Sequence, residues 1–140
     1  MSIFSDSDST VGLPDPAPAA TLLGQAPNAS LEPGHREQAS TDRSGFVAQT
    51  HPDGVVFAES AGDVAETLRL ATRHRVPVVP RGAGTGLAGG SSARSGEVVL
   101  DVSRMNKILR IDPQEQLAVV QPGVLNAQIN AAAAEYGLFY

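Results

Sequence analysis

The sequence has no cysteine and no tryptophan, and aromatic side chains make up only 4% of its 140 residues. Without cysteine the chain has no disulfide framework, no thiolate metal site and no thiol nucleophile. Its three histidines, His35, His51 and His74, are scattered along the sequence. A histidine-rich metal site is therefore not expected either, and we predict no bound metal.

Long apolar runs are also missing. The longest, such as residues 131–134, are far shorter than the about 20 residues that a membrane-spanning helix needs. The first residues, MSIFSDSDST, lack the basic and apolar regions of a secretory signal, so we expect a cytoplasmic protein. Ten basic against 15 acidic residues give a net charge of −5, which speaks against binding to nucleic acid or to an anionic membrane.

The chain has enough hydrophobic residues to form the core of one domain, since 41% of its residues are hydrophobic and only 18% are charged. Acidic residues and proline gather at the start: residues 1–43 hold six acids, two bases and five of the ten prolines. We expect residues 1–44 to form a largely disordered or irregular arm and residues 45–140 to form the domain. Residues 19–23 have the composition to start a short helix, and whether the arm docks on the domain is left open.

From about residue 45 the hydrophobic pattern predicts the order β-α-β-β-β-β-α. We expect strands over 55–57, 76–79, 97–101, 108–111 and 117–121, and helices over 61–74 and 125–136. The last two strands should form an antiparallel pair joined by a turn over 112–115, which has Pro113 at its second position. Ser60 and Asp63 are typical of a capped helix start, and Gly137 is typical of a helix end. The predicted fold class is α+β, with helices packed on a small mixed sheet.

The segment that asks for a chemical explanation is the glycine-rich stretch 80–92, PRGAGTGLAGGSS. So many glycines let the backbone approach a ligand and let successive N–H groups point into one concavity, which binds anions, chiefly phosphate. Gly84, Gly86 and Gly89 have the Rossmann spacing, but the seven residues before the next strand are too few for a crossover helix. A P-loop needs lysine where Gly90 stands. A purely structural loop is a further alternative.

The segments around this loop, VPVVPRGAGTGL and then VVLDVSRMNKI, resemble a known family. They are similar to the PCMH-type FAD-binding domain of the vanillyl-alcohol oxidase/p-cresol methylhydroxylase superfamily, and point to its glycolate oxidase FAD subunit and D-lactate dehydrogenase branch. The likeness runs from about residue 51 to 140 and touches residues 41–44 more weakly. The family's chain continues with a second glycine-rich segment and a substrate domain. We therefore expect an N-terminal fragment that forms the first half of such a domain.

The resemblance implies that the loop backbone wraps the FAD pyrophosphate and that a later turn contacts the flavin. The implied cofactor-binding residues are Arg81, Gly82, Ala83, Gly84, Thr85, Gly86, Leu87, Gly89, Gly90 and Ser91, followed by Pro122, Gly123 and Val124. Some relatives attach the flavin covalently through a histidine in this loop, and residues 84–86 contain none, so non-covalent FAD is expected. Two structural alternatives stay open: Arg81 binds a carbonyl or pairs with Asp101, and Pro122-Gly123 is an ordinary turn.

The function implied by the resemblance is FAD binding within a flavin-dependent oxidoreductase that acts on a 2-hydroxy acid such as glycolate or D-lactate. No catalytic residue is assigned, because that part of the family's site lies beyond Tyr140, and the chain alone is expected to be inactive. The electron acceptor and the oligomeric state are left open. The alternatives are a truncated, non-catalytic fragment and a different nucleotide-binding domain that uses the same loop.

Overall fold

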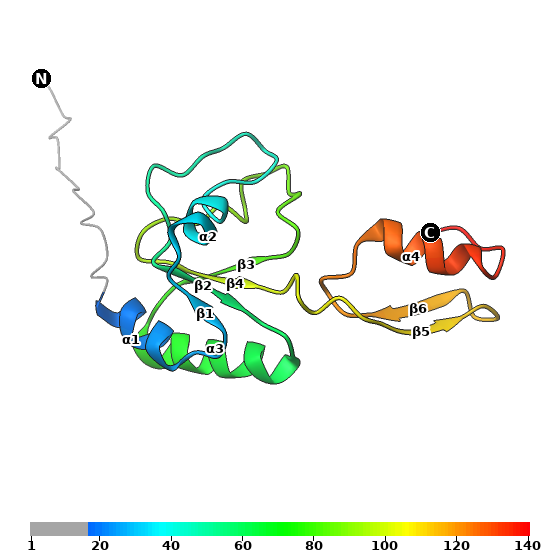
Figure 1. The fold of residues 1–140 in the computed structure, drawn as a ribbon, viewed down its shortest axis with the longest axis horizontal. Helices are drawn as coiled ribbons and strands as arrows, with labels where there is room; N and C mark the ends of the chain where they lie inside the picture. Colours follow the sequence, from blue (N-terminus) through cyan, green and yellow to red (C-terminus); the bar gives the residue numbers. More distant parts are fainter. Residues whose placement is uncertain (1–16) are drawn as a thin grey trace, which may run out of the picture.

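The computed structural model describes residues 17–140. Their main element is a four-stranded sheet with the strand order β1-β2-β4-β3 (Figure 1). The first 16 residues of the predicted arm lie outside the described residues. β2 and β3 both run parallel to β4, whereas β1 is antiparallel to β2. The strands are β1 (Ala29–Ser30), β2 (Gly54–Phe57), β3 (Val78–Arg81) and β4 (Val98–Asp101).

Helices cover both faces of this sheet. The side chains of a β-strand alternate between its two faces, so Val56 and Val98 pack with α1 (Ala17–Gln25) and α3 (Ala61–His74). The neighbouring residues of the same strands face the other side, where α2 (Pro33–Gln38) lies and where Ala39 and Ala93 join a second cluster. β4 is buried on both faces, as its continuous apolar run requires.

The described part of the predicted arm is docked on the domain. α1 extends the short helix expected over 19–23, and its Leu22 is fully buried in the same core as Val56. The sequence did not reveal α2, because Pro33 and Gly34 are typical helix breakers. Pro33 stands in the first turn, where a helix needs no N–H donor, so the helix forms in spite of it.

The predicted helix over 61–74 is confirmed with its cap. The Oγ atom of Ser60 accepts a hydrogen bond from the Asp63 N–H at 3.2 Å, and the Asp63 carboxylate accepts in return from the backbone of Glu59 and Ser60. The N–H of Glu59, together with Ser60, lowers the pKa of the Asp63 carboxyl.

The predicted strand over 76–79 lies two residues later, as β3. Arg75 adopts a left-handed conformation with φ 55°, and the Val76 N–H bonds back to the Ala71 carbonyl at 3.0 Å, so Val76 still belongs to the end of α3. The strand then passes through Pro80, because β3 is an edge strand and tolerates a residue without an N–H group. Arg81 is consequently the last residue of the strand.

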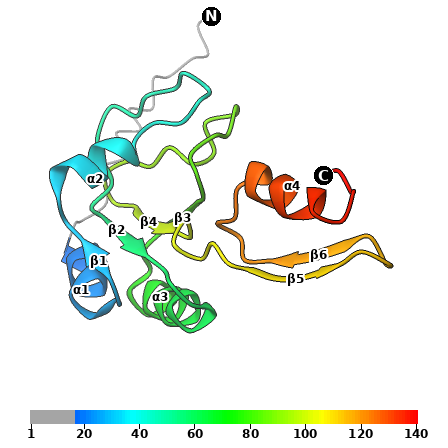
Figure 2. The ribbon, with the colours of Figure 1, turned by 45° about the vertical axis from the view of Figure 1, so that its right-hand side comes forward.

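The remaining elements lie beside the main sheet (Figures 1 and 2). β5 (Ile108–Asp112) and β6 (Leu117–Val120) form the predicted antiparallel hairpin, and α4 (Asn126–Ala134) lies along it. Gly137 follows α4 with φ 70°, as predicted for a helix end. The α+β fold class is confirmed. Between residues 17 and 140, no helix has the length and apolar character that crossing a bilayer requires.

Candidate functional site

The glycine loop leaves the sheet at the carboxyl end of β3. The three parallel strands end side by side at Phe57, Asp101 and Arg81, which are register partners. Ligands of open parallel sheets bind outside this edge of the sheet. The loop lines an open depression of about 350 Å³. Its lining comprises Pro80, Gly82, Ala83, Gly84, Thr85, Gly86, Leu87, Ala88, Gly90 and Ser91.

The Arg81 side chain lies beneath this loop and is only 9% exposed. Val79 and Arg81 share one face of β3, the face on which Ala39 and Ala93 pack. On that face the Nη1 atom of Arg81 donates hydrogen bonds to two main-chain carbonyls, of Thr41 at 2.8 Å and of Ser91 at 3.0 Å. One side chain thereby ties residue 41 to the far end of the glycine loop.

Arg81 has no carboxylate partner in the described part of the chain. Asp101 is its register partner, but the Asp101 carboxylate instead accepts a hydrogen bond from the Ser103 N–H at 2.8 Å. Of the two structural alternatives for Arg81, the carbonyl contact is the one observed. Both hydrogen-bond partners are neutral carbonyls, so no carboxylate of the described residues pairs with the positive charge of this guanidinium.

Gly84 rests directly on this guanidinium. Its φ of 67° is left-handed, and a Cβ atom at this position would lie 2.8 Å from the Cζ atom of Arg81. A Cβ at Gly82 or Gly90 would meet no atom within 4 Å, so the bare backbone there faces open space. Glycine at residue 84 is therefore favoured by its left-handed φ, and a side chain there would have to displace the Arg81 guanidinium, while at residues 82 and 90 glycine leaves room for a ligand.

A second loop, residues 41–46, packs against the glycine loop. The Oδ2 atom of Asp42 accepts a hydrogen bond from the Ser91 hydroxyl at 3.3 Å, and its Oδ1 atom accepts from the Ser44 N–H at 2.9 Å. These bonds, chiefly those from Ser44, lower the pKa of Asp42. Phe46 fills the space beside Gly89. The sequence offered only a weak likeness over 41–44. Asp42 and Ser91 are 49 positions apart in the sequence, so no local pattern indicated their contact.

The predicted turn at Pro122-Gly123-Val124 adjoins the same loop. With Leu125 and Asn126 it lines a depression of about 340 Å³, whose other wall is Ala83 and Thr85. The structure thus brings the two predicted segments together, since Ala83 and Thr85 line both depressions. Arg81 and Gly89 do not line either of them, because the first lies beneath the loop and the second packs on Phe46.

Gly123 also has a structural reason for being glycine. A Cβ atom there would lie 2.8 Å from the Ser103 carbonyl oxygen and 2.9 Å from that of Met105. Its N–H donates to the Met105 carbonyl at 2.8 Å. The turn is therefore held tightly against the connection between β4 and β5.

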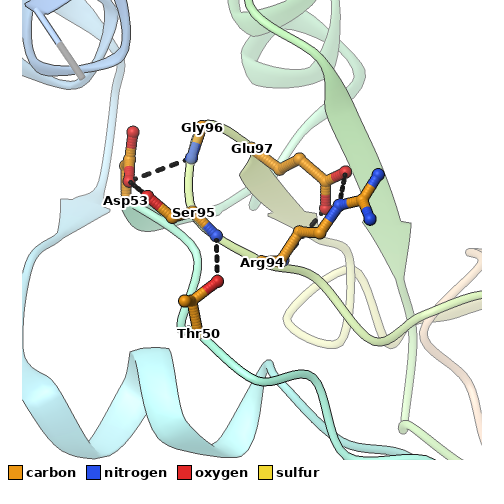
Figure 3. A network of polar contacts seen from close by, with 6 residues as sticks. All are labelled: Thr50, Asp53, Arg94, Ser95, Gly96 and Glu97. Atoms are coloured by element: carbon orange, nitrogen blue, oxygen red, sulfur yellow. Dashed lines mark hydrogen bonds and ion pairs between the residues drawn. The ribbon is translucent and has the colours of Figure 1, made fainter. Parts of the chain in front are cut away.

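The exit of the glycine loop is fixed by a polar network (Figure 3). The Oδ1 atom of Asp53 accepts from the Gly96 N–H at 3.2 Å, and the Ser95 N–H donates to the Thr50 hydroxyl at 3.0 Å. The Glu97 carboxylate binds both the backbone and the guanidinium of Arg94. The loop is thus anchored at its entry by Arg81 and at its exit by this network, while its middle is exposed.

These features suit an anion. Exposed backbone over a buried, unpaired positive charge offers hydrogen-bond donors and a favourable potential for phosphate. Among residues 17–140, no cluster of histidine and carboxylate side chains could hold a metal ion.

Residues 52–140 match the family described as FAD binding domain. The similar curated proteins include the glycolate oxidase subunit GlcD of Bacillus subtilis (strain 168), which is 41% identical over 92 residues, covering 66% of this chain and 20% of that protein. D-2-hydroxyglutarate dehydrogenase of Stutzerimonas stutzeri (strain A1501) is 40% identical over 89 residues, covering 64% of this chain and 19% of that protein. D-lactate dehydrogenase of Anaerostipes hadrus is 32% identical over 124 residues, covering 89% of this chain and 24% of that protein. The chain spans about a fifth of the length of the first two relatives.

Solved structures share the fold. 4-Ethylphenol oxidase from Gulosibacter chungangensis superposes with a TM-score of 0.73 at 23% identity, covering 90% of this chain and 27% of that one. p-Cresol methylhydroxylase superposes with a TM-score of 0.67 at 27% identity, covering 84% of this chain and 23% of that one.

Proposed function

Because this chain belongs to the PCMH-type FAD-binding domain family of the vanillyl-alcohol oxidase superfamily, we propose that it binds FAD non-covalently through its glycine loop. The family match, from residue 52 to 140, supports a division into an arm over 1–44 and a flavin-binding part over 45–140. The arm contributes more than a tail in this proposal, because Thr41 and Asp42 contact Arg81 and Ser91.

The observation that carries the proposal is the buried guanidinium of Arg81 under the exposed backbone of residues 82–86. A pyrophosphate is doubly negative or more at neutral pH, so it gains both from main-chain N–H donors and from an unpaired positive charge beneath them. In the proposed complex the loop backbone binds the phosphates, and Arg81 supplies charge and holds the loop in shape.

The second proposed contact is the turn at 122–124. Its support is geometric: this turn and the loop residues Ala83 and Thr85 enclose one depression. The identity of Gly123 adds no support, since packing against Ser103 and Met105 already requires glycine there.

Non-covalent attachment is proposed because residues 82–91 include no histidine, cysteine or tyrosine that could bond to the flavin. Bound FAD supplies the capacity to accept a hydride, and the protein supplies position and electrostatics. The catalytic residues are not assigned to any part of this chain.

We propose further that the chain serves a flavin-dependent oxidoreductase acting on a small 2-hydroxy acid such as glycolate or D-lactate. Support comes from the names of its relatives, glycolate oxidase subunit and D-lactate dehydrogenase. The chain spans about a fifth of the first of these, so the activity, the substrate and the electron acceptor of the whole enzyme stay proposals.

The test is equilibrium dialysis of the full chain against FAD, ADP and NAD. FAD is expected to bind, and ADP is expected to compete, since it carries the same pyrophosphate and adenosine. NAD carries the same ADP part, so it should also compete, but with a nicotinamide in place of the flavin it should bind more weakly than FAD. Retention of NAD in preference to FAD would instead favour a different nucleotide-binding domain with the same loop.

A further inference from the structure

Two charges of opposite sign lie close to the glycine loop. The Arg81 guanidinium lies directly beneath Gly84, and its Nη1 atom also binds the Ser91 carbonyl. The Asp42 carboxylate binds the Ser91 hydroxyl, and a Cβ atom at Gly86 would lie 3.6 Å from its Oδ2 atom. A ligand over Gly84 therefore lies above the positive charge, whereas a ligand near Gly86 and Ser91 also meets a negative charge.

The Asp42 carboxylate forms no ion pair within the described residues, since no arginine, lysine or histidine between residues 17 and 140 pairs with it. Ser44 and Ser91 are its hydrogen-bond donors: the Ser44 N–H and the Ser91 hydroxyl both donate to the carboxylate and favour its ionised form. The group is thus an anion at neutral pH.

We propose that Asp42 is a specificity-determining residue that bars phosphate from the Gly86–Ser91 end of the loop. The pyrophosphate then has to lie over residues 82–85, above Arg81 and next to the turn at 122–124. The physical reason is that phosphate oxygens brought close to a carboxylate without an ion-pair partner are repelled, whereas uncharged donors such as hydroxyl groups are accepted. This inference rests on the proposed FAD binding.

A purely structural role for Asp42 makes the opposite prediction. If its carboxylate only ties the 41–46 loop to the glycine loop, removing the charge loosens the site and weakens every ligand. If it repels phosphate, removing the charge strengthens the binding of a ligand that consists of phosphate alone. The sign of the change separates the two roles.

The test measures binding of inorganic pyrophosphate and of FAD to the full chain and to its Asp42→Asn variant by calorimetry. The asparagine keeps an oxygen that can accept from the Ser44 N–H. We expect pyrophosphate to bind about 3- to 10-fold tighter to the variant at low salt, and the gain to shrink in high salt as the charges are screened. Glu115→Gln removes the same charge from the β5–β6 turn, away from the loop, and should change nothing.

A second neutral variant, Asp42→Ser, guards against a folding defect peculiar to asparagine, and thermal unfolding of both variants checks that they are folded. Unchanged or weaker pyrophosphate binding by both folded variants, with FAD still binding to the unmodified chain, overturns the inference alone. Failure of the unmodified chain to bind FAD overturns the proposed function as well.

Discussion

The guanidinium of Arg81 occupies the space into which any side chain at residue 84 would project, with Cζ 2.8 Å from the position of a Cβ atom on Gly84. The same guanidinium holds the carbonyls of Thr41 and Ser91. One side chain therefore joins the end of β3, the arm and the far side of the glycine loop. The proposed flavin site depends on this arrangement, and several of the following predictions test it.

Replacing Arg81 should separate its role in holding the glycine loop in shape from the role of its positive charge. Arg81→Met leaves two carbonyls without a donor and removes the charge, so it should lose about 1–3 kcal/mol of stability in urea unfolding and most of the FAD affinity. Arg81→Lys should lose similar stability but retain more affinity, because it keeps the charge. Arg110→Lys, on the exposed hairpin, is the matched control. Equal FAD affinity of the two Arg81 variants would show that the charge is not what binds the cofactor.

Gly123→Ala should destabilise the fold. Its Cβ would press on the Ser103 and Met105 carbonyl oxygens, and because these are main-chain atoms the crowding should cost about 1–3 kcal/mol. In Gly82→Ala the Cβ meets nothing within 4 Å, so chemical denaturation should show almost no change in stability. If the two variants unfold at the same denaturant concentration, the claim that the 122–124 turn is tightly packed is contradicted.

The cap of α3 predicts a pH dependence. The native pKa of Asp63 lies below its unfolded value, so its contribution is present above the unfolded pKa and is lost as the pH falls through the native pKa. The midpoint temperature of thermal unfolding should therefore be lower for Asp63→Ala than for the unmodified chain at pH 7. This difference between the two midpoints should shrink below about pH 4. A difference that grows on acidification would contradict the capping box.

FAD bound to the chain should be released by denaturation. Because residues 82–91 offer no histidine, cysteine or tyrosine, acid precipitation should leave all flavin fluorescence in the supernatant. Flavin that stays with the precipitated protein on a denaturing gel would refute non-covalent attachment.

Local signals predicted much of this fold. Ser60 and Asp63 indicated the start of α3, and Pro113 with its neighbours indicated the turn between β5 and β6. The strand at 76–79 was misplaced by two residues, because the left-handed Arg75 and the edge position of β3 depend on packing that a local pattern does not contain. α2 was missed because Pro33 and Gly34 are typical helix breakers, although a proline in the first turn is tolerated.

The site was predictable only in part. The glycine spacing and the family resemblance identified residues 81–91, but neither indicated that Arg81 would bind Thr41 across 40 residues. The role proposed for Asp42 likewise depends on a contact 49 residues away. Such long-range contacts follow from the tertiary fold and leave no periodic or local trace in a single sequence.

The most direct test of FAD binding at the glycine loop is a fluorescence titration of FAD with the unmodified chain, Gly84→Val and Gly137→Val. Both glycines have a positive φ, but only a side chain at residue 84 would collide with Arg81. We predict saturable binding by the unmodified chain and by Gly137→Val. Gly84→Val should bind FAD about tenfold more weakly or worse, a loss of about 1.4 kcal/mol, because its side chain would displace the Arg81 guanidinium and the loop backbone. No binding by the unmodified chain, or equal binding by folded Gly84→Val, would contradict the account.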